Sequence, residues 1–208
     1  METKDTTDLE ARIIEAAKQV FIRKGYAAAT MSDVAAEVGI GRTALHYYFR
    51  TKDILFEAIS GQLLSTFLPN IDRIMDEEST ILEKMPKIID CYMKMVRANP
   101  LIPGFVISEM RRDPQHLLQT FMKNQQAIQP LLRLRRQVED EMEKGLINKI
   151  PIVDLVTTVV SMVVFPILVR QPLMISFMDN DANQFDAYMD RRKKLIVEVV
   201  MHLLSPKL

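Results

Sequence analysis

Two short helices separated by a glycine-containing turn constrain the fold of this chain more than any other feature of its sequence. Thr30-Met31-Ser32-Asp33 places a threonine three residues before an acid, which is the capping-box pattern and predicts the start of a helix. Gly39-Ile40-Gly41 is expected to break that helix, because glycine is favoured just after a helix end. A second short helix is expected over about 42–49, and this arrangement is typical of a helix-turn-helix motif.

Longer helical segments flank the motif on both sides. Apolar residues recur at three-and-four spacing over about 9–24, which predicts an amphipathic helix that stops at a glycine. Thr51 is expected to cap a further helix that ends just before Pro69. These helices predict an N-terminal domain over residues 8–68, with the helix-turn-helix at about 31–50.

The remainder of the chain, residues 69–208, is also expected to be helical, which makes the predicted fold class all-α. Only 6 glycines occur among the 208 residues and strong helix formers are frequent, so a β-sheet is disfavoured. Pro86 offers an alternative start for the first of these helices, because proline is favoured in a first helical turn. Pro130 and Pro166 fall inside two helices and are expected to kink them. The predicted helices cover about 79–98, 101–112, 115–143, 152–169 and 183–204.

The most apolar segment is too short for a transmembrane helix. It has 15 uncharged residues between Asp154 and Arg170, whereas a spanning helix needs about 20. A helix buried in a core or an oligomer interface is therefore the better interpretation. The first residues contain no apolar signal core, and the single Cys91 cannot form an intramolecular disulfide. A cytoplasmic location without membrane contact is therefore expected.

The second helix of the motif combines one apolar face with one polar face. At 100° per residue, Leu45 and Phe49 project to the apolar half and are expected to anchor the helix on a core. The opposite half carries polar and aromatic side chains, namely Arg42, Thr43, His46 and Tyr47. Side chains that donate hydrogen bonds to phosphate oxygens and base edges are what a helix in a major groove requires.

Positive charge is concentrated near this helix and not over the whole chain. The 27 basic and 27 acidic residues balance, so net charge does not indicate a polyanionic partner. Residues 39–52 contain Arg42, Arg50 and Lys52 and no acid. Lys52 lies at an expected helix N-terminus, where backbone N–H groups favour an anion, so it is predicted to contact a phosphate. On these residues alone, a DNA-binding surface and an ordinary solvated helix face are equally good interpretations.

The segment from about 9 to 60 resembles the DNA-binding domain of TetR-type transcriptional regulators. The resemblance rests on Lys24-Gly25-Tyr26, on the turn that ends at Val38-Gly39 and on Tyr47-x-Phe49-x-x-Lys52, which occur in order at the spacings of the family. Two positions depart from the family pattern, since the cap of the second short helix is often Ser and is Gly41 here. His46 occupies a position that often holds Tyr, so the contact made there is expected to differ.

The resemblance implies a homodimeric regulator of transcription, usually a repressor, and not an enzyme. It implies that residues 69–208 form a larger helical domain that dimerises through its last two long helices and encloses an effector pocket of unidentified residues. A small-molecule effector would then release double-stranded operator DNA by a population shift. The residues that the resemblance and the helix face together assign to DNA binding are Thr30, Arg42, Thr43, His46, Tyr47, Tyr48 and Lys52.

A rival interpretation is a helical small-molecule-binding protein or enzyme whose N-terminal helices are only structural. His116 and His202 have no second ligand at helical spacing, and neither a phosphate-binding loop nor a nucleophile motif occurs. No metal, cofactor or catalytic residue is therefore expected. Methionine is frequent after residue 60 and conforms to varied apolar ligands, so an apolar or amphipathic effector is expected. Ordinary core packing explains the same methionines equally well.

Overall fold

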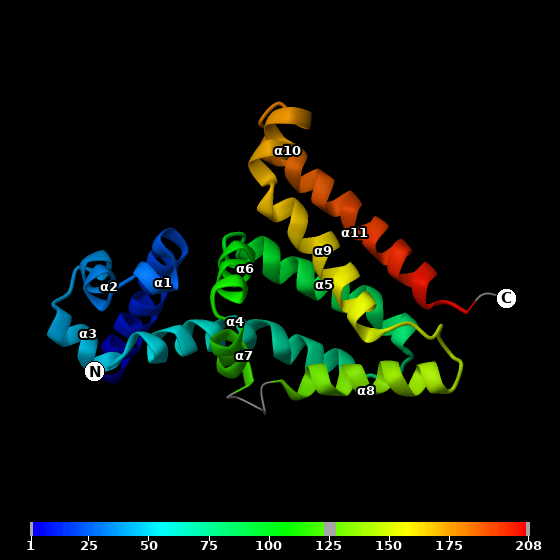
Figure 1. Ribbon diagram of the computed structural model, residues 1–208, viewed down its shortest axis with the longest axis horizontal. Coiled ribbons are helices and arrows are strands. Elements are labelled where there is room, and N and C mark those ends of the chain that lie inside the picture. Colours follow the sequence, from blue (N-terminus) through cyan, green and yellow to red (C-terminus); the bar gives the residue numbers. More distant parts are fainter. Residues whose placement is uncertain (1, 123–127, 207–208) are drawn as a thin grey trace. The chain divides into compact units, whose positions relative to one another are not determined.

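The computed structural model describes residues 2–122 and 128–206, which form α-helices joined by turns (Figure 1). These described residues contain no strand, and the all-α prediction is confirmed. The helices are α1 (Glu2–Ala28), α2 (Met31–Val38), α3 (Arg42–Tyr48), α4 (Lys52–Met75), α5 (Ile81–Ala98), α6 (Ile102–Arg112), α7 (Pro114–Met122), α8 (Gln129–Glu143), α9 (Ile152–Leu168), α10 (Arg170–Phe177) and α11 (Ala182–Leu204).

The chain packs into two compact units. Unit 1 comprises Met1–Ser65 and Gly104–Gln125, and unit 2 comprises Thr66–Pro103 and Gln126–Leu208. Helices α6 and α7 therefore pack with the N-terminal helices, although they follow them by many residues. The functional division between residues 8–68 and 69–208 stays a prediction.

The core of unit 1 joins the helix-turn-helix to its neighbours. Leu45 and Phe49 are buried at 0% and 4% exposure, as expected for the anchors of α3. Phe21 of α1 stacks on Phe105 of α6 with 6.4 Å between ring centroids, and Leu117 of α7 is buried in the same cluster. Phe105 and Leu117 thus pack α6 and α7 into the same core as α1 and the motif.

Local sequence signals set the helix ends around the motif. Thr30 and Asp33 form the predicted capping box of α2, and Gly39 ends this helix in the left-handed conformation at φ 80°. Gly41 precedes α3 without a side-chain cap. Gly25 has φ 73° and breaks the helical geometry of α1, and a second short helical segment follows it to Ala28. The predicted helix break at Gly25 is therefore confirmed, and the short segment after it was not expected.

Two predicted effects of proline are wrong. Helix α4 continues through Pro69 to Met75, because its later turns bury Ile71 and Ile74 and this burial outweighs one lost backbone hydrogen bond. Helix α5 starts at a second capping box, Thr80 with Glu83, so Pro86 lies inside the helix and not in its first turn.

The predicted helix 115–143 is also wrong as a continuous element. Helices α7 and α8 replace it, and residues 123–127 lie outside the described part of the chain. Pro130 stands in the first turn of α8, where its missing N–H costs nothing. Pro166 lies inside α9 as predicted, but the short helix α10 was not expected.

Unit 2 is built around α5, α9 and α11, whose buried residues include Ile89, Val163 and Ile196. Figure 1 shows α9 and α11 as neighbouring helices, with α10 between them in the chain. None of the described helices is long and apolar enough by itself to cross a membrane. The bent pair α9 and α10, with 67° between its halves, meets that test only by length and composition.

A buried polar network holds the start of α5 in unit 2. The Lys84 ammonium, at 2% exposure, donates to the carbonyl of Met75 at 3.2 Å and to Gln137 Oε1 at 2.9 Å. The Gln137 amide donates in turn to Glu141, whose carboxylate also accepts from the backbone N–H of Ile81 at 3.0 Å. Every charge in this network therefore has hydrogen-bond partners, as buried charges require.

Candidate nucleic-acid interface

Helix α3 presents the predicted polar face to solvent. Arg42 and Thr43 are exposed, and 82% of Tyr47 is accessible. His46 and Tyr48 are half-buried beside them. The structure thus brings these five predicted residues together on one short helix, which its buried face fixes to the core.

Hydrogen bonds order the basic side of α3. Arg42 Nε donates to His46 Nε2 at 3.2 Å, and His46 Nδ1 lies 3.2 Å from the carbonyl oxygen of Arg50. Since Nε2 accepts, the imidazole satisfies both contacts when it is neutral with its proton on Nδ1. Among the described residues this contact uses one donor of the Arg42 guanidinium, and its remaining N–H groups can donate to a ligand.

The two tyrosines of α3 form an aromatic pair at the surface. Their rings lie 5.4 Å apart at 83°, which is an edge-to-face arrangement. Tyr48 also packs on the unit 1 core and supports Tyr47, which extends into solvent. A largely exposed aromatic ring is costly unless a partner covers it, so this pair favours a surface that binds another molecule.

Thr30 lies at the start of α2 and is committed to its cap. Its hydroxyl accepts from the backbone N–H of Asp33 at 3.1 Å and donates to the carboxylate of the same residue at 2.9 Å. The Lys24 ammonium, 2.7 Å from that carboxylate, and Thr30 together lower the pKa of Asp33 to about 2. Thr30 is thus exposed, but its visible function is to begin the helix.

Lys52 has a role that its position in the sequence did not reveal. Its ammonium donates to the carbonyl oxygens of Tyr26 at 2.7 Å, Ala29 at 3.0 Å and Ala27 at 3.3 Å, and lies 4.4 Å from the Tyr26 ring centroid. Three carbonyls account for its three protons. Lys52 therefore caps the C-terminal end of α1, and its phosphate contact stays a prediction.

Tyr26 is the centre of a cluster that joins α1 and α4 to α6 and α7 within unit 1. Its hydroxyl donates to Asp53, which lies 3.4 Å from His116 Nε2. Its backbone N–H donates to Glu109 at 3.2 Å, and Arg112 binds the same carboxylate at 2.6 Å. Burial first, and the Asp53 carboxylate second, raise the pKa of Tyr26.

Sequence reasoning missed this cluster because its members lie far apart in the chain. Glu109 is only 2% exposed, and it accepts a hydrogen bond from the backbone N–H of Tyr26, which is 83 residues away in the sequence. The one local signal was the spacing of Glu109 and Arg112, which allows an ion pair within one helix. The break at Gly25 frees the Tyr26 N–H, and a remote carboxylate satisfies it.

Metal chemistry has no visible place in the parts of the chain that the structure describes. No group of three or more His, Cys, Asp or Glu side chains is arranged there to hold an ion.

Comparison with known proteins assigns the N-terminal segment to a family model. Residues 13–59 match the model described as "Bacterial regulatory proteins, tetR family", and this segment contains α2, α3 and the start of α4. The segment that carries the helix-turn-helix is therefore similar to the N-terminal domain of TetR-family regulators. The exposed face of α3 described above lies in the segment that matches the family model.

Curated relatives that match part of this chain are named as transcriptional regulators. The HTH-type regulator YfiR of Bacillus subtilis is 37% identical over 37% of this chain and 38% of its own length. The nicotine-responsive repressor HdnoR of Paenarthrobacter nicotinovorans is 26% identical over 53% of this chain and 59% of its own length. The chain thus matches less than two thirds of the length of either relative.

Solved structures share the fold over almost the whole chain. The TetR-family regulator PfmR of Thermus thermophilus superposes with a TM-score of 0.62 at 19% identity, covering 90% of this chain and 97% of that one. At this identity the superposition shows a shared fold and nothing about individual side chains.

Proposed function

We propose that this protein is a DNA-binding transcriptional regulator of the TetR type, most simply a repressor, which a small molecule releases from its operator. The observation that carries the proposal is α3, whose apolar side is buried at Leu45 and Phe49 while its basic and aromatic side is exposed. The names of the relatives support a regulator and not an enzyme. A cytoplasmic location, beside the DNA, belongs to the same proposal.

The residues of α3 and its surroundings would have different roles in DNA recognition. Arg42, Thr43 and Tyr47 are exposed and would contact base edges or phosphates in a major groove. His46 and Tyr48 would support them from half-buried positions, each contributing its outer edge to the contact. Thr30, at the start of α2, would approach the backbone of the same duplex, where helix N-termini favour phosphate.

Lys52 would serve both the fold and the DNA. Its ammonium is held at the end of α1, but it remains half-buried beside the first turn of α4. A phosphate at this helix start would be bound by backbone N–H groups, with the charge of Lys52 adding attraction at short range. This arrangement would need no change in the hydrogen bonds of Lys52.

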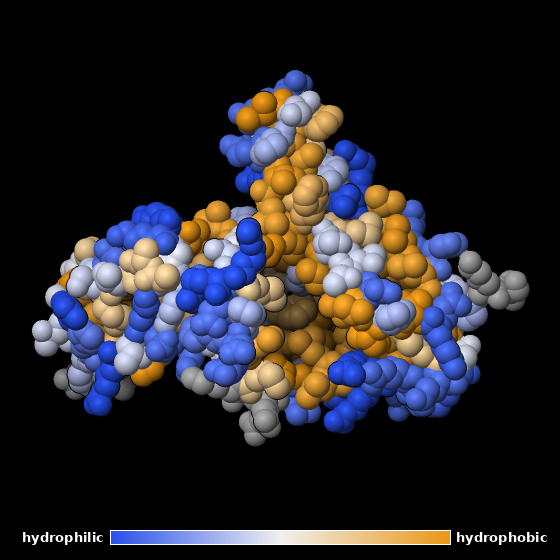
Figure 2. Space-filling view, in the orientation of Figure 1, coloured by the Kyte–Doolittle hydropathy of each residue, from blue (hydrophilic) through white to orange (hydrophobic). Residues whose placement is uncertain are grey.

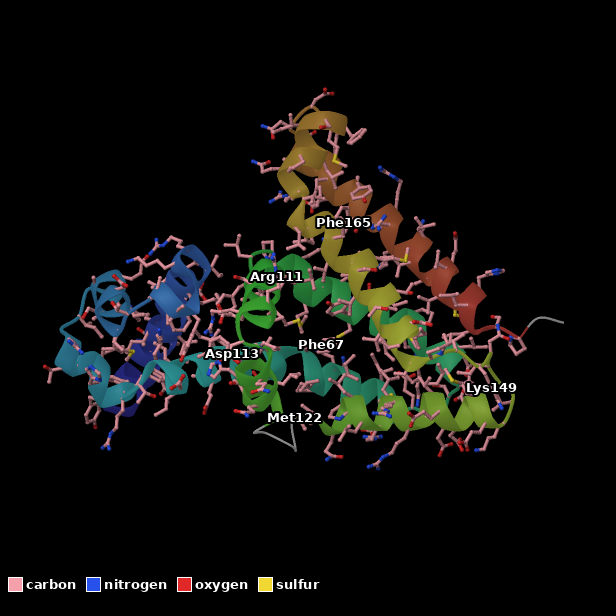
Figure 3. The ribbon with its side chains drawn as sticks, in the orientation of Figure 1. Phe67, Arg111, Asp113, Met122, Lys149 and Phe165 are labelled. Carbon is pink, nitrogen blue, oxygen red and sulfur yellow. The ribbon has the colours of Figure 1, made fainter. Side chains whose placement is uncertain are left out.

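Apolar residues on the surface of unit 2 support a homodimer. Figure 2 shows hydrophobic side chains gathered along the part of the molecule formed by α9 and α10. On α9, Val153, Val156 and Val160 are 63%, 52% and 40% exposed, and Phe165, marked in Figure 3, is 59% exposed. Exposed apolar surface of this extent favours association, and a second copy would cover it with the same helices.

A dimer would position two copies of α3 on successive major grooves, about 34 Å apart along a pseudo-palindromic operator. Helix α4 begins four residues after α3 ends and extends into unit 2, so the chain itself links the two activities. An effector that favours one conformer of unit 2 would then change operator affinity by its differential affinity for the two conformers.

The decisive experiment is selection of duplexes from a random pool by the purified protein, followed by titration of the selected site. We expect Arg42→Ala and Tyr47→Ala to weaken binding by about 1–3 kcal/mol each, as lost base contacts do. Arg136→Ala is the matched control, because Arg136 is an exposed arginine of α8 in unit 2. Selection of no sequence, or equal binding by all variants, would overturn the proposal.

Oligomeric state is tested separately by sedimentation at micromolar concentration. We expect the protein to be a dimer and Val156→Glu to be monomeric, because the carboxylate would have to be buried in the interface. Leu118→Glu in α7 is the control, since Leu118 is exposed to a similar degree, 55% against 52%. A monomeric wild type would contradict the dimer.

A further inference from the structure

A pocket of about 970 Å³ lies entirely within unit 2, between α4, α5 and α11. Part of its lining is apolar and comes from Phe67, Ile74, Met95 and Val197. Figure 3 marks Phe67 on α4. The volume is that of a small-molecule site, and the apolar part is large enough for a ligand with a hydrocarbon body.

The charged part of the lining is basic in sum. It contains five basic and three acidic side chains, namely Arg73, Lys87, Lys94, Lys193 and Lys194 against Glu77, Asp90 and Glu198. A ligand in the pocket therefore meets an excess of two positive charges. Such a lining attracts anions and disfavours cations.

The ion pairs inside the pocket leave part of this charge without compensation. Asp90 is shared by Lys193 and Lys94, each at 2.7 Å, so one carboxylate faces two ammonium groups. The same two lysines lower the pKa of Asp90, with Lys193 the larger cause. Arg73 donates at 2.9 Å to the neutral amide oxygen of Asn70. An anionic group on a ligand would give these cations charge-assisted hydrogen bonds.

We propose that this pocket binds an amphipathic anion, with its apolar body against Phe67 and Val197 and its carboxylate or phosphate head among Arg73, Lys94 and Lys194. The inference rests on the proposed function for the biological role of the ligand, which would be the effector. Ligand binding is measured without DNA, so the absence of binding to the pocket and the absence of DNA regulation are separate results.

Cys91 supplies a reporter inside the same pocket. It is the single cysteine of the sequence, it is half-buried, and it lines the pocket. Burial raises the pKa of its thiol, so its alkylation is slow and is measured readily over time. A ligand seated in the pocket would cover this thiol and slow the reaction further.

The experiment measures the alkylation rate of Cys91 in the full chain with four ligands that share one hydrocarbon chain. Decanoate and decyl phosphate carry anionic heads, decanol a neutral head and decyltrimethylammonium a cationic head. We expect both anions, or one of them, to protect Cys91 at concentrations at least about tenfold lower than decanol or the cation do. Which anion protects better identifies the head group.

Lys194→Glu tests whether the charge of the pocket selects the ligand. Lys194 is exposed, and no ion pair with it occurs among the described residues, so the substitution removes no contact that holds the fold. We expect it to weaken protection by the anion about tenfold, whereas Lys149→Glu, an exposed lysine outside this pocket, leaves protection unchanged. Circular dichroism establishes that both variants are folded.

Three outcomes would overturn the inference. These are protection by decyltrimethylammonium or decanol as strong as that by the anions, absence of protection by any ligand, and an equal effect of Lys194→Glu and Lys149→Glu. If Cys91 is protected without ligand and the protection grows with protein concentration, a second copy of the chain covers the pocket. That result also overturns the inference. An effect of the anion on operator affinity is scored separately, as a test of the proposed function.

Discussion

Lys52 in unit 1 and Lys84 in unit 2 solve the same problem in different surroundings. Each ammonium donates to carbonyl oxygens at the C-terminal end of a preceding helix, Lys52 at the end of α1 and Lys84 at Met75 of α4. Lysine suits this position, because the last carbonyls of a helix lack partners and carry partial negative charge.

The two lysines differ in their access to water and to other molecules. Lys84 is 2% exposed and donates a hydrogen bond to Gln137, which in turn donates to Glu141. Lys52 is half-buried at the edge of the proposed DNA surface, with the Tyr26 ring on one side. The comparison shows that a buried cap can only stabilise the fold, whereas a cap near the surface can also meet a ligand.

Removal of the buried cap should have the largest effect. We expect Lys84→Ala to lower the free energy of unfolding by about 3 kcal/mol, because it leaves the Met75 carbonyl and Gln137 without this donor and also removes the buried aliphatic stem of Lys84. Lys84→Met, which keeps the aliphatic stem, should cost clearly less. Urea unfolding followed by circular dichroism measures both variants. Equal stability of Lys84→Ala and wild type would contradict the view that the buried lysine stabilises the fold more than Lys52 does.

Removal of the surface cap should cost less stability but affect DNA. We expect Lys52→Ala to lower the free energy of unfolding by about 1–2 kcal/mol, since solvent can reach part of the site. Operator and random duplexes should both bind more weakly, with a salt slope reduced by about 1. Lys144→Ala, a substitution of an exposed lysine in unit 2, is the control. An unchanged salt slope would make Lys52 a structural cap only.

Tyr26→Phe sharpens the comparison, because Lys52 lies against a tyrosine ring and no such ring contact is described for Lys84. The variant keeps the surface under the Lys52 ammonium and loses only the hydrogen bond to Asp53. We expect a loss of about 1 kcal/mol in the free energy of unfolding, as for one partly exposed hydrogen bond to a charged group. Thermal unfolding of wild type and variant measures it, and a loss as large as that of Lys84→Ala would contradict the ranking.

The smallest expected effect concerns pH and the cap of α2. The pKa of Asp33 is lowered from 3.8 to about 2, so its folded form binds the proton less readily than the unfolded chain does. Its stabilising contribution is therefore complete above about pH 4 and is lost as the pH falls towards 2. We expect Asp33→Asn to flatten this part of the melting temperature profile. A variant whose acid profile matches that of wild type would contradict the cap.

Local physics made the motif predictable from the sequence. The capping box of Thr30, the left-handed Gly39 and the buried side of α3 each depend on residues within a few positions of one another. The exposed face of α3 followed from helical periodicity alone. The contacts of these side chains with DNA depend on a partner molecule that the sequence does not describe, so they stay a prediction.

Non-local contacts account for what was missed. Pro69 stays inside α4 because burial of its last turns in unit 2 outweighs a local preference. Glu109 finds its partner 83 residues away, and Lys52 reaches carbonyls more than 20 residues before it. The pocket of unit 2 collects side chains from three helices, which no single segment reveals.

The placement of α6 and α7 in unit 1 has a consequence for protein engineering. The chain crosses between the units three times, after residues 65 and 103 and again between α7 and α8. A fragment that ends near residue 68 would lack Phe105, Leu117 and Glu109, and would leave an aromatic cavity and an unsatisfied backbone N–H at Tyr26. The N-terminal helices alone therefore do not form a module that can be transplanted, and functional chimaeras should exchange α6 and α7 together with them.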